Sequence, residues 1–258
     1  MKRIVAYFII TVMCAVSAIA QERTVENRPY TDLRPFHFGV LVGTHFQDIE
    51  LNNVGPQVIT TEDGTIDALV TCDQDRWDAG FNVGVLGEFR LGTHFALRVA
   101  PAMYFGTKHF TFLNLKETPD GKPIEEQEEP QNNKQVTQIS VLKTAYMSCA
   151  FELIFSAKRF NNHRPYMMLG LNPMLNLSNK EDEYLKMKKF DAYLEAGLGC
   201  DFYLPFFKLR PELKFAYGLT NCIDTDHGNH LKDKNMLQYT NSVNKGRSKM
   251  IVLTFYFE

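Results

Sequence analysis

The chain has 258 residues, with 28 Lys and Arg against 30 Asp and Glu, so its formal net charge is −2. A chain so close to neutrality lacks the basic excess of a nucleic-acid-binding protein, and we expect no nucleic-acid partner. Five cysteines are too few for a disulfide scaffold, and the absence of any run of 18 apolar residues after residue 20 argues against a transmembrane helix there.

Residues 1–20 have the three parts of a secretory signal peptide. The basic start "MKR" precedes an apolar run, and "AIA" supplies the small residues that stand before a cleavage site. An uncleaved membrane helix is the alternative, but the apolar run is short for a span. We therefore expect an exported mature chain that begins near Gln21, with a formal net charge of −4 once two basic residues are removed from −2.

The rest of the chain contains eight segments in which apolar residues recur at every second position. A period of two predicts β-strands that have two different faces. Because alternation by itself does not distinguish a soluble sandwich from a membrane barrel, further features must decide between them. The segments are 36–47, 80–91, 94–106, 145–157, 164–177, 190–204, 207–220 and 248–258.

Three features favour a membrane barrel over a secreted sandwich. The chain is expected to be exported, the segments are long enough to cross a membrane at a tilt, and long and short connections alternate strictly. We therefore predict an all-β fold, an eight-stranded antiparallel up-and-down transmembrane β-barrel in the cell outer membrane. Both termini would be periplasmic and the long loops extracellular. The expected organisation is a signal peptide (1–20), a short periplasmic segment (21–35) and the barrel (36–258).

Charged residues lie on the face opposite the apolar one, and we expect them to fill the lumen. An eight-stranded barrel is just wide enough to be filled by its own side chains, and buried charges must pair. We expect a structural ion network; a proton or ion path, as in a small passive ion-conducting barrel, is the alternative. The predicted members are Glu88, Arg90, Arg98, Glu152, Glu195, Arg210, Glu212 and Lys214.

The predicted loops hold few candidates for a binding site. The acidic stretch 117–130 is typical of a solvated loop, with cation binding or partner docking as alternatives. Asp226, His227 and His230 are candidate metal ligands, but their spacing matches no known motif, so we expect no metal and no cofactor. Cys72 and Cys222 lie on the same predicted side of the barrel, so a disulfide between them stays open.

Nothing in the sequence favours an enzyme. Hydrolase, zinc-protease, P-loop and dinucleotide-binding fingerprints are absent. His45 and Asp48, near the end of the first segment, are the candidates for a rim enzyme acting on lipid or peptide. We predict a non-catalytic protein. Mid-strand prolines, Pro101, Pro173 and Pro211, predict β-bulges because proline removes a ladder hydrogen bond.

The last segment is expected to close the barrel against the first and to face outer-membrane lipid. Its outward face carries Ile251, Leu253, Phe255 and Phe257. The segment resembles the aromatic C-terminal strands through which outer-membrane proteins meet the barrel-insertion machinery, although Glu258 follows the final aromatic residue.

Three stretches together resemble the PorT family of outer-membrane barrels: "RPFHFGVLVGTHFQDIEL", "GCDFYLPFFKLRPELKFAYGLTN" and "YTNSVNKGRSKMIVLTFYFE". The resemblance implies a component of the type IX protein secretion system, which is linked to gliding, and it implies other secretion components as partners. Eight strands are too few for a conduit that passes folded cargo. We therefore expect an accessory or assembly role.

Overall fold

The computed structural model describes residues 25–61, 64–115, 136–178, 184–230 and 236–258. Most of these residues lie in β-strands, and the short helices all lie outside the large sheet. No helix among the described residues is long and apolar enough to cross a membrane. The elements are η1 (Thr31–Leu33), β1 (Phe36–Asn53), β2 (Gln57–Thr61), β3 (Gly64–Ala68), β4 (Val70–Asp73), β5 (Asp78–Arg90), β6 (Phe95–Asn114), β7 (Val136–Ser156), β8 (His163–Asn176), β9 (Phe190–Tyr203), β10 (Lys208–Gly218), η3 (Thr225–His230), α2 (Leu237–Thr240) and β11 (Val243–Phe257).

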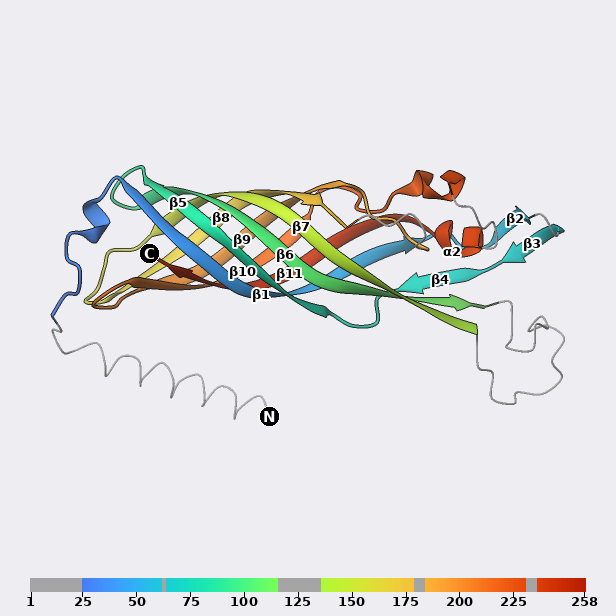
Figure 1. Ribbon diagram of the computed structural model, residues 1–258, viewed down its shortest axis with the longest axis horizontal. Helices are drawn as coiled ribbons and strands as arrows, with labels where there is room; N and C mark the ends of the chain where they lie inside the picture. The colour runs from blue at the N-terminus through green and yellow to red at the C-terminus, as the bar shows by residue number, and fades with distance from the viewer. Residues whose placement is uncertain (1–24, 62–63, 116–135, 179–183, 231–235) are drawn as a thin grey trace, which may run out of the picture.

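Eight long strands form a closed antiparallel ring. The hydrogen-bonded order runs β6-β5-β1-β11-β10-β9-β8-β7, and the pairing of β7 with β6 returns to the start. Closure therefore leaves no free edge along the body of the tube. Figure 1 shows a long tube with the C-terminus and η1 at one end and β2, β3 and α2 at the other. We call these the near end and the far end.

The eight ring strands match the eight segments predicted from alternation, but four of them run clearly farther toward the far end. β1 continues to Asn53, β6 continues to Asn114, β7 already begins at Val136, and β11 already begins at Val243. The expected long loops 48–79, 107–144 and 221–247 are therefore partly strand, and the first also holds the β2–β3 hairpin and β4. Sequence alternation missed these extensions because polar residues such as His109 and Thr111 interrupt the apolar face there.

The outward faces of the ring strands form a continuous apolar band. Large exposed residues such as Phe38, Leu171 and Leu213 belong to it, and so do Ile251, Leu253 and Phe255 of the last strand. The band ends at the same level on neighbouring strands, where polar residues replace apolar ones on the outward face. At that level Asp48 pairs with Lys249, and Thr107 pairs with Lys143.

The expected bulges at the mid-strand prolines are not present. Pro101, Pro173 and Pro211 each interrupt the ladder on one side, toward β5, β7 and β9 respectively, while the register is the same on both sides of each gap. Each proline still pairs with its other neighbour strand. The loss of backbone hydrogen bonds on one side of each proline costs less free energy than a one-residue change of register, which would turn every later side chain of the strand to the opposite face.

A buried apolar core closes the far end, beyond the level where the apolar band stops. It is buried between the extended strands and the far-end connections. Tyr184 and Tyr239 pack against Phe112 with ring centroids 5.8 and 5.4 Å apart. We call this cluster the far cap; its buried members are Ile49, Ile59, Ala68, Val70, Cys72, Phe110, Phe112, Leu142, Leu185, Met187, Cys222, Ile223 and Val243.

The segment before β1 lies across the near end and is held there by polar contacts. The Arg159 guanidinium donates to the backbone oxygens of Asn27 and Arg28 and stacks 3.7 Å from the centroid of the Tyr203 ring. Asp32 accepts a hydrogen bond of 2.6 Å from the Tyr203 hydroxyl. The described part of the predicted segment 21–35 is therefore fixed to the barrel.

Candidate functional site

The interior of the tube holds a network of buried charges in its near half. Strands with a period of two turn every second residue inward, so charged residues on different strands meet at similar depths. Arg98 of β6 lies at the centre and is fully buried. Its guanidinium contacts Glu152 of β7 at 3.0 Å and Glu212 of β10 at 2.8 Å.

Lys214 of β10 is the second cationic centre of this network. Its ammonium lies 3.0 Å from Glu152 and 3.3 Å from Glu195. Asn172 donates to the other oxygen of Glu195 at 2.7 Å. Each carboxylate here is therefore reached by at least one charged or polar donor, as burial away from water requires.

Two tyrosines complete the pairing of Glu212. The Tyr166 hydroxyl donates to one carboxylate oxygen at 2.7 Å, and the Tyr256 hydroxyl donates to the other at 3.1 Å. The Arg98 guanidinium also lies over the Tyr256 ring, 4.2 Å from its centroid. A cation over an aromatic face is stabilised by the ring quadrupole, so these tyrosines serve both partners of the ion pair.

A third group of charges lies closer to the near end, around Arg210. The Arg210 guanidinium forms ion pairs with Asp201 and Glu258, each at 2.6 Å, and with Glu88. Lys208 contacts Glu258 as well. The last residue of the chain thus lies inside the barrel and binds two cationic side chains.

The structure places seven of the eight predicted network residues in the interior; Arg90 is the exception. Its side chain is exposed at the end of β5 and donates to the backbone oxygens of Leu33 and Gly92. Three members were missed: Asp201, Lys208 and Glu258. All three have the inward parity of Glu195, Arg210 and Tyr256 on the same strands, and that parity was the signal that could have found them.

The balance of charge in the network differs from the expected four against four. With Arg90 outside and the three missed residues included, six carboxylates face four cationic side chains. Each cation contacts two or three carboxylates. Arg98 contacts Glu88, Glu152 and Glu212, and Lys214 contacts Glu152, Glu195 and Glu212. Arg210 contacts Glu88, Asp201 and Glu258, and Lys208 contacts Asp201 and Glu258. Such sharing joins five strands, β5, β6, β7, β9 and β10, and the residue that follows β11 through the interior.

The candidate residues for a rim enzyme are not brought together. His45 is buried inside the tube, 5.3 Å from the Tyr104 ring centroid, whereas Asp48 lies on the opposite face of β1 at the edge of the apolar band. Residues three apart on a strand point to opposite faces, so a joint catalytic role is geometrically excluded for this pair.

The other predicted candidates also stay apart. Asp226 is exposed and His227 is buried; the side chain of His230 and the acidic stretch 117–130 lie outside the described residues, as does the predicted signal peptide. Across the described residues, no three His, Cys, Asp or Glu side chains lie close enough to hold a metal ion. Cys72 and Cys222 are free thiols buried in the far cap, so the disulfide is not formed.

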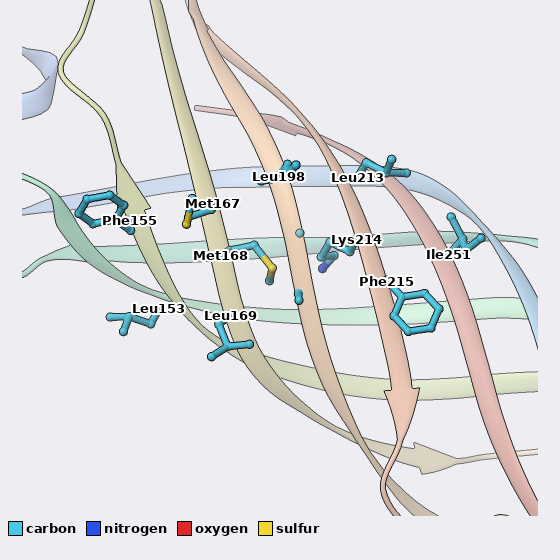
Figure 2. A pocket seen from close by; sticks show the side chains of 12 residues that line it. Leu153, Phe155, Met167, Met168, Leu169, Leu198, Leu213, Lys214, Phe215 and Ile251 are labelled. Carbon is cyan, nitrogen blue, oxygen red and sulfur yellow. The ribbon is translucent and has the colours of Figure 1, made fainter. Parts of the chain in front are cut away.

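The outer wall of the tube carries an open hollow of about 720 Å³ over β8, β9 and β10. Figure 2 shows Met167, Leu169, Leu198 and Leu213 around it. Ala196 and Gly197 leave space between these larger neighbours, and the ammonium of Lys214 turns inward to Glu152. The hollow is therefore a gap in an apolar surface and offers no group for catalysis.

Comparison with known protein families identifies the surroundings of the apolar band. The family model "Outer membrane protein beta-barrel domain" matches residues 19–224, which is most of the chain. The chain belongs to this family. The predicted all-β barrel and its outer-membrane location are confirmed, and the apolar band is the surface that faces lipid.

The chain is also similar to two solved outer-membrane barrels. OprG from Pseudomonas aeruginosa is 10% identical with a TM-score of 0.44, over 85% of this chain and 93% of that one. Neisserial surface protein A is 11% identical with a TM-score of 0.38, over 86% of this chain and 98% of the other. A comparison with curated proteins found no match.

Proposed function

We propose that this protein is a non-catalytic outer-membrane component of the type IX secretion machinery, with an accessory or assembly role. Its partners would be other secretion components, and its route to the membrane would be export by a cleaved signal peptide followed by insertion through β11. The near end would face the periplasm and the far end the cell exterior. The resemblance of three stretches to the PorT family supports the secretion role.

The observation that carries the accessory role is the filled interior. Arg98, Glu152, Glu195 and Lys214 are each 3% exposed or less, and they come from four different strands. A conduit for polypeptide would require this network to break, at a cost of about 3–5 kcal/mol for each buried charge left without its partner. The same network disfavours a passive ion-conducting barrel, because an ion would have to displace these contacts.

Gene deletion combined with a cargo assay tests this proposal. In cells that lack the protein, cargo should accumulate in the periplasm, while the amounts of unrelated outer-membrane proteins stay unchanged. Complementation with the wild-type chain should restore cargo at the surface. Cargo that still reaches the surface without the protein would rule out the secretion role.

Planar-bilayer recording tests the filled interior separately. The purified protein should give no steady conductance. Stable channels from the wild-type barrel would favour the ion-conducting alternative, whatever the result of the deletion.

A further inference from the structure

Beyond the lipid-facing band, β7 pairs with a described strand on one side only. It pairs with β6 along its whole length, from Phe155 to Val136, but its ladder with β8 begins at Tyr146. Among the described residues, none pairs with the other edge of Val136–Leu142. Figure 1 shows β6 and β7 running together past the ends of β5 and β8, with β4 beside the far end of β6. A strand edge of this kind presents a row of backbone donors and acceptors.

The direction in which the backbone groups of this edge point follows from the hydrogen bonds of the neighbouring residues Lys143 and Ala145. The Leu177 amide donates to the Ala145 carbonyl oxygen at 2.8 Å, and the Ser178 hydroxyl donates to that of Lys143 at 2.6 Å. Both carbonyls thus point toward the β8 side. Because direction alternates along a strand, Ile139 and Val141 also turn their amide and carbonyl groups to that side. The residues between them turn theirs to β6.

The side chains at the edge are apolar where water is expected. Ile139 and Val141 are each 60% exposed on the outward face. They lie beyond Lys143, the residue at which the apolar band of β7 ends. Hydrocarbon therefore does not cover them. An exposed edge with two adjacent outward apolar residues is a liability that proteins ordinarily block with charges or proline.

We propose that Val136–Leu142 is a docking edge for an extended strand of a separate protein, which adds beside β7 in continuation of β8. Unpaired backbone donors and acceptors select an extended backbone, since a lipid or a helical surface would leave them without partners. The outward pair, Ile139 and Val141, selects apolar residues at alternate positions of that strand. The Ala145–Leu177 bond shows that the same edge already accepts a strand. This inference holds whether or not the partner belongs to a secretion machine.

Amide hydrogen exchange on the purified full-length protein in detergent tests the free edge. The amides of Ile139 and Val141 should exchange at least about tenfold faster than those of Ser140 and Leu142, which bond to β6. Equal protection of all four amides would mean that the chain already covers this edge, and would overturn the proposal.

Site-specific photo-crosslinking in intact cells tests the occupant. Crosslinkers placed one at a time at Ile139, Val141 and Lys143 should reach one segment of one protein, at positions that step by two residues. Such a register is the signature of strand pairing. Adducts confined to lipid, to a second copy of this chain, or to scattered positions would overturn the proposal, and so would the absence of adducts.

Two substitutions at Val141 separate backbone pairing from side-chain contact. Val141→Pro removes an edge donor while keeping the ladder with β6, since proline is tolerated where the lost donor faces outward. It should reduce the adducts at positions 139 and 143 at least tenfold. Val141→Thr keeps the donor and should retain most of both. Equal loss in the two variants would show an apolar contact instead of an added strand. Amide exchange at Ser140 and Leu142 checks that both variants keep the β6 ladder.

Discussion

The membrane-crossing interior and the far cap share several strands, yet shared ion pairs organise the interior and apolar contacts organise the far cap. Along β6 the inward residues change from Arg98 to Phe110 and Phe112 within 14 residues. Where the outward face meets lipid, apolar residues cover the outside, and ion pairs hold the near half of the interior together beside buried apolar residues such as Leu86 and Val252. Beyond the band the outward face meets water, so the inward face becomes apolar as in a soluble protein.

This difference explains why the two regions should respond differently to damage. The interior network is a set of shared ion pairs, so the loss of one cation removes a buried partner from two or three carboxylates at once. The far cap is a hydrophobic core, so one loss leaves a cavity whose cost depends on local relaxation. Three experiments examine this contrast, beginning with the largest expected effect.

Replacement of the central arginine is the most damaging change. Arg98→Met should lower the free energy of unfolding by about 3–5 kcal/mol, because the buried Glu212 loses its closest cation and Glu152 loses one of its two. Urea titration followed by heat-modifiable gel migration measures the loss. Arg90→Met is the matched control, since Arg90 is exposed, and it should change the unfolding free energy by less than about 0.5 kcal/mol.

A variant that fails to assemble would still leave this prediction testable. Adding Glu212→Gln to Arg98→Met neutralises the carboxylate that has lost its closest cation and should recover part of the folded barrel. Normal stability of Arg98→Met, or no difference from Arg90→Met, would contradict a network in which the cations are shared.

Removal of an aromatic side chain from the far cap should have a smaller and more local effect. Phe112→Ala leaves a cavity beside Tyr184 and Tyr239, with an expected cost of about 3 kcal/mol. Because the cap lies above the apolar band, the barrel should keep its heat-modifiable migration while protease cuts the far-end segments faster. Phe112→Leu is the control and should be cut at nearly the wild-type rate. Loss of the barrel together with the cap would show that the two regions unfold as one unit.

The sequence predicted the tube well because alternation reports directly on which side of a strand meets lipid. The eight strands and the inward side of seven charged residues follow from parity. Arg90 was misplaced because parity gives the side of a strand but not where the strand leaves the barrel; at the end of β5 its side chain bends to the backbone of Leu33. The far cap was missed for two reasons: some of its residues, such as Phe112, lie on strand extensions whose outward face is partly polar, and others, such as Leu185 and Ile223, lie in segments without a simple period.

The labelling rates of the two far-cap cysteines, Cys72 and Cys222, test the smallest expected difference between the far cap and the interior. Burial raises the pKa of the Cys222 thiol to about 11 and also raises the pKa of Cys72, so both remain protonated at neutral pH. At pH 8 only about one Cys222 in a thousand is a thiolate, the form that reacts. A water-soluble maleimide should therefore label it slowly, with a rate that rises about tenfold per pH unit up to the pKa.

The labelling experiment uses a chain in which Cys149 and Cys200, which are only partly buried, are replaced by alanine. In that background Phe112→Ala should speed the labelling of Cys222 and Cys72, because an open cap lowers the cost of a thiolate in contact with water. The double variant Arg98→Met/Glu212→Gln, which acts inside the membrane, should leave the rate unchanged wherever the barrel still folds. If the interior variant exposed these thiols as much as Phe112→Ala does, the interior network and the far cap would unfold as one cooperative unit. The strands that continue from the lipid-facing tube into the far cap would then transmit the damage from one region to the other.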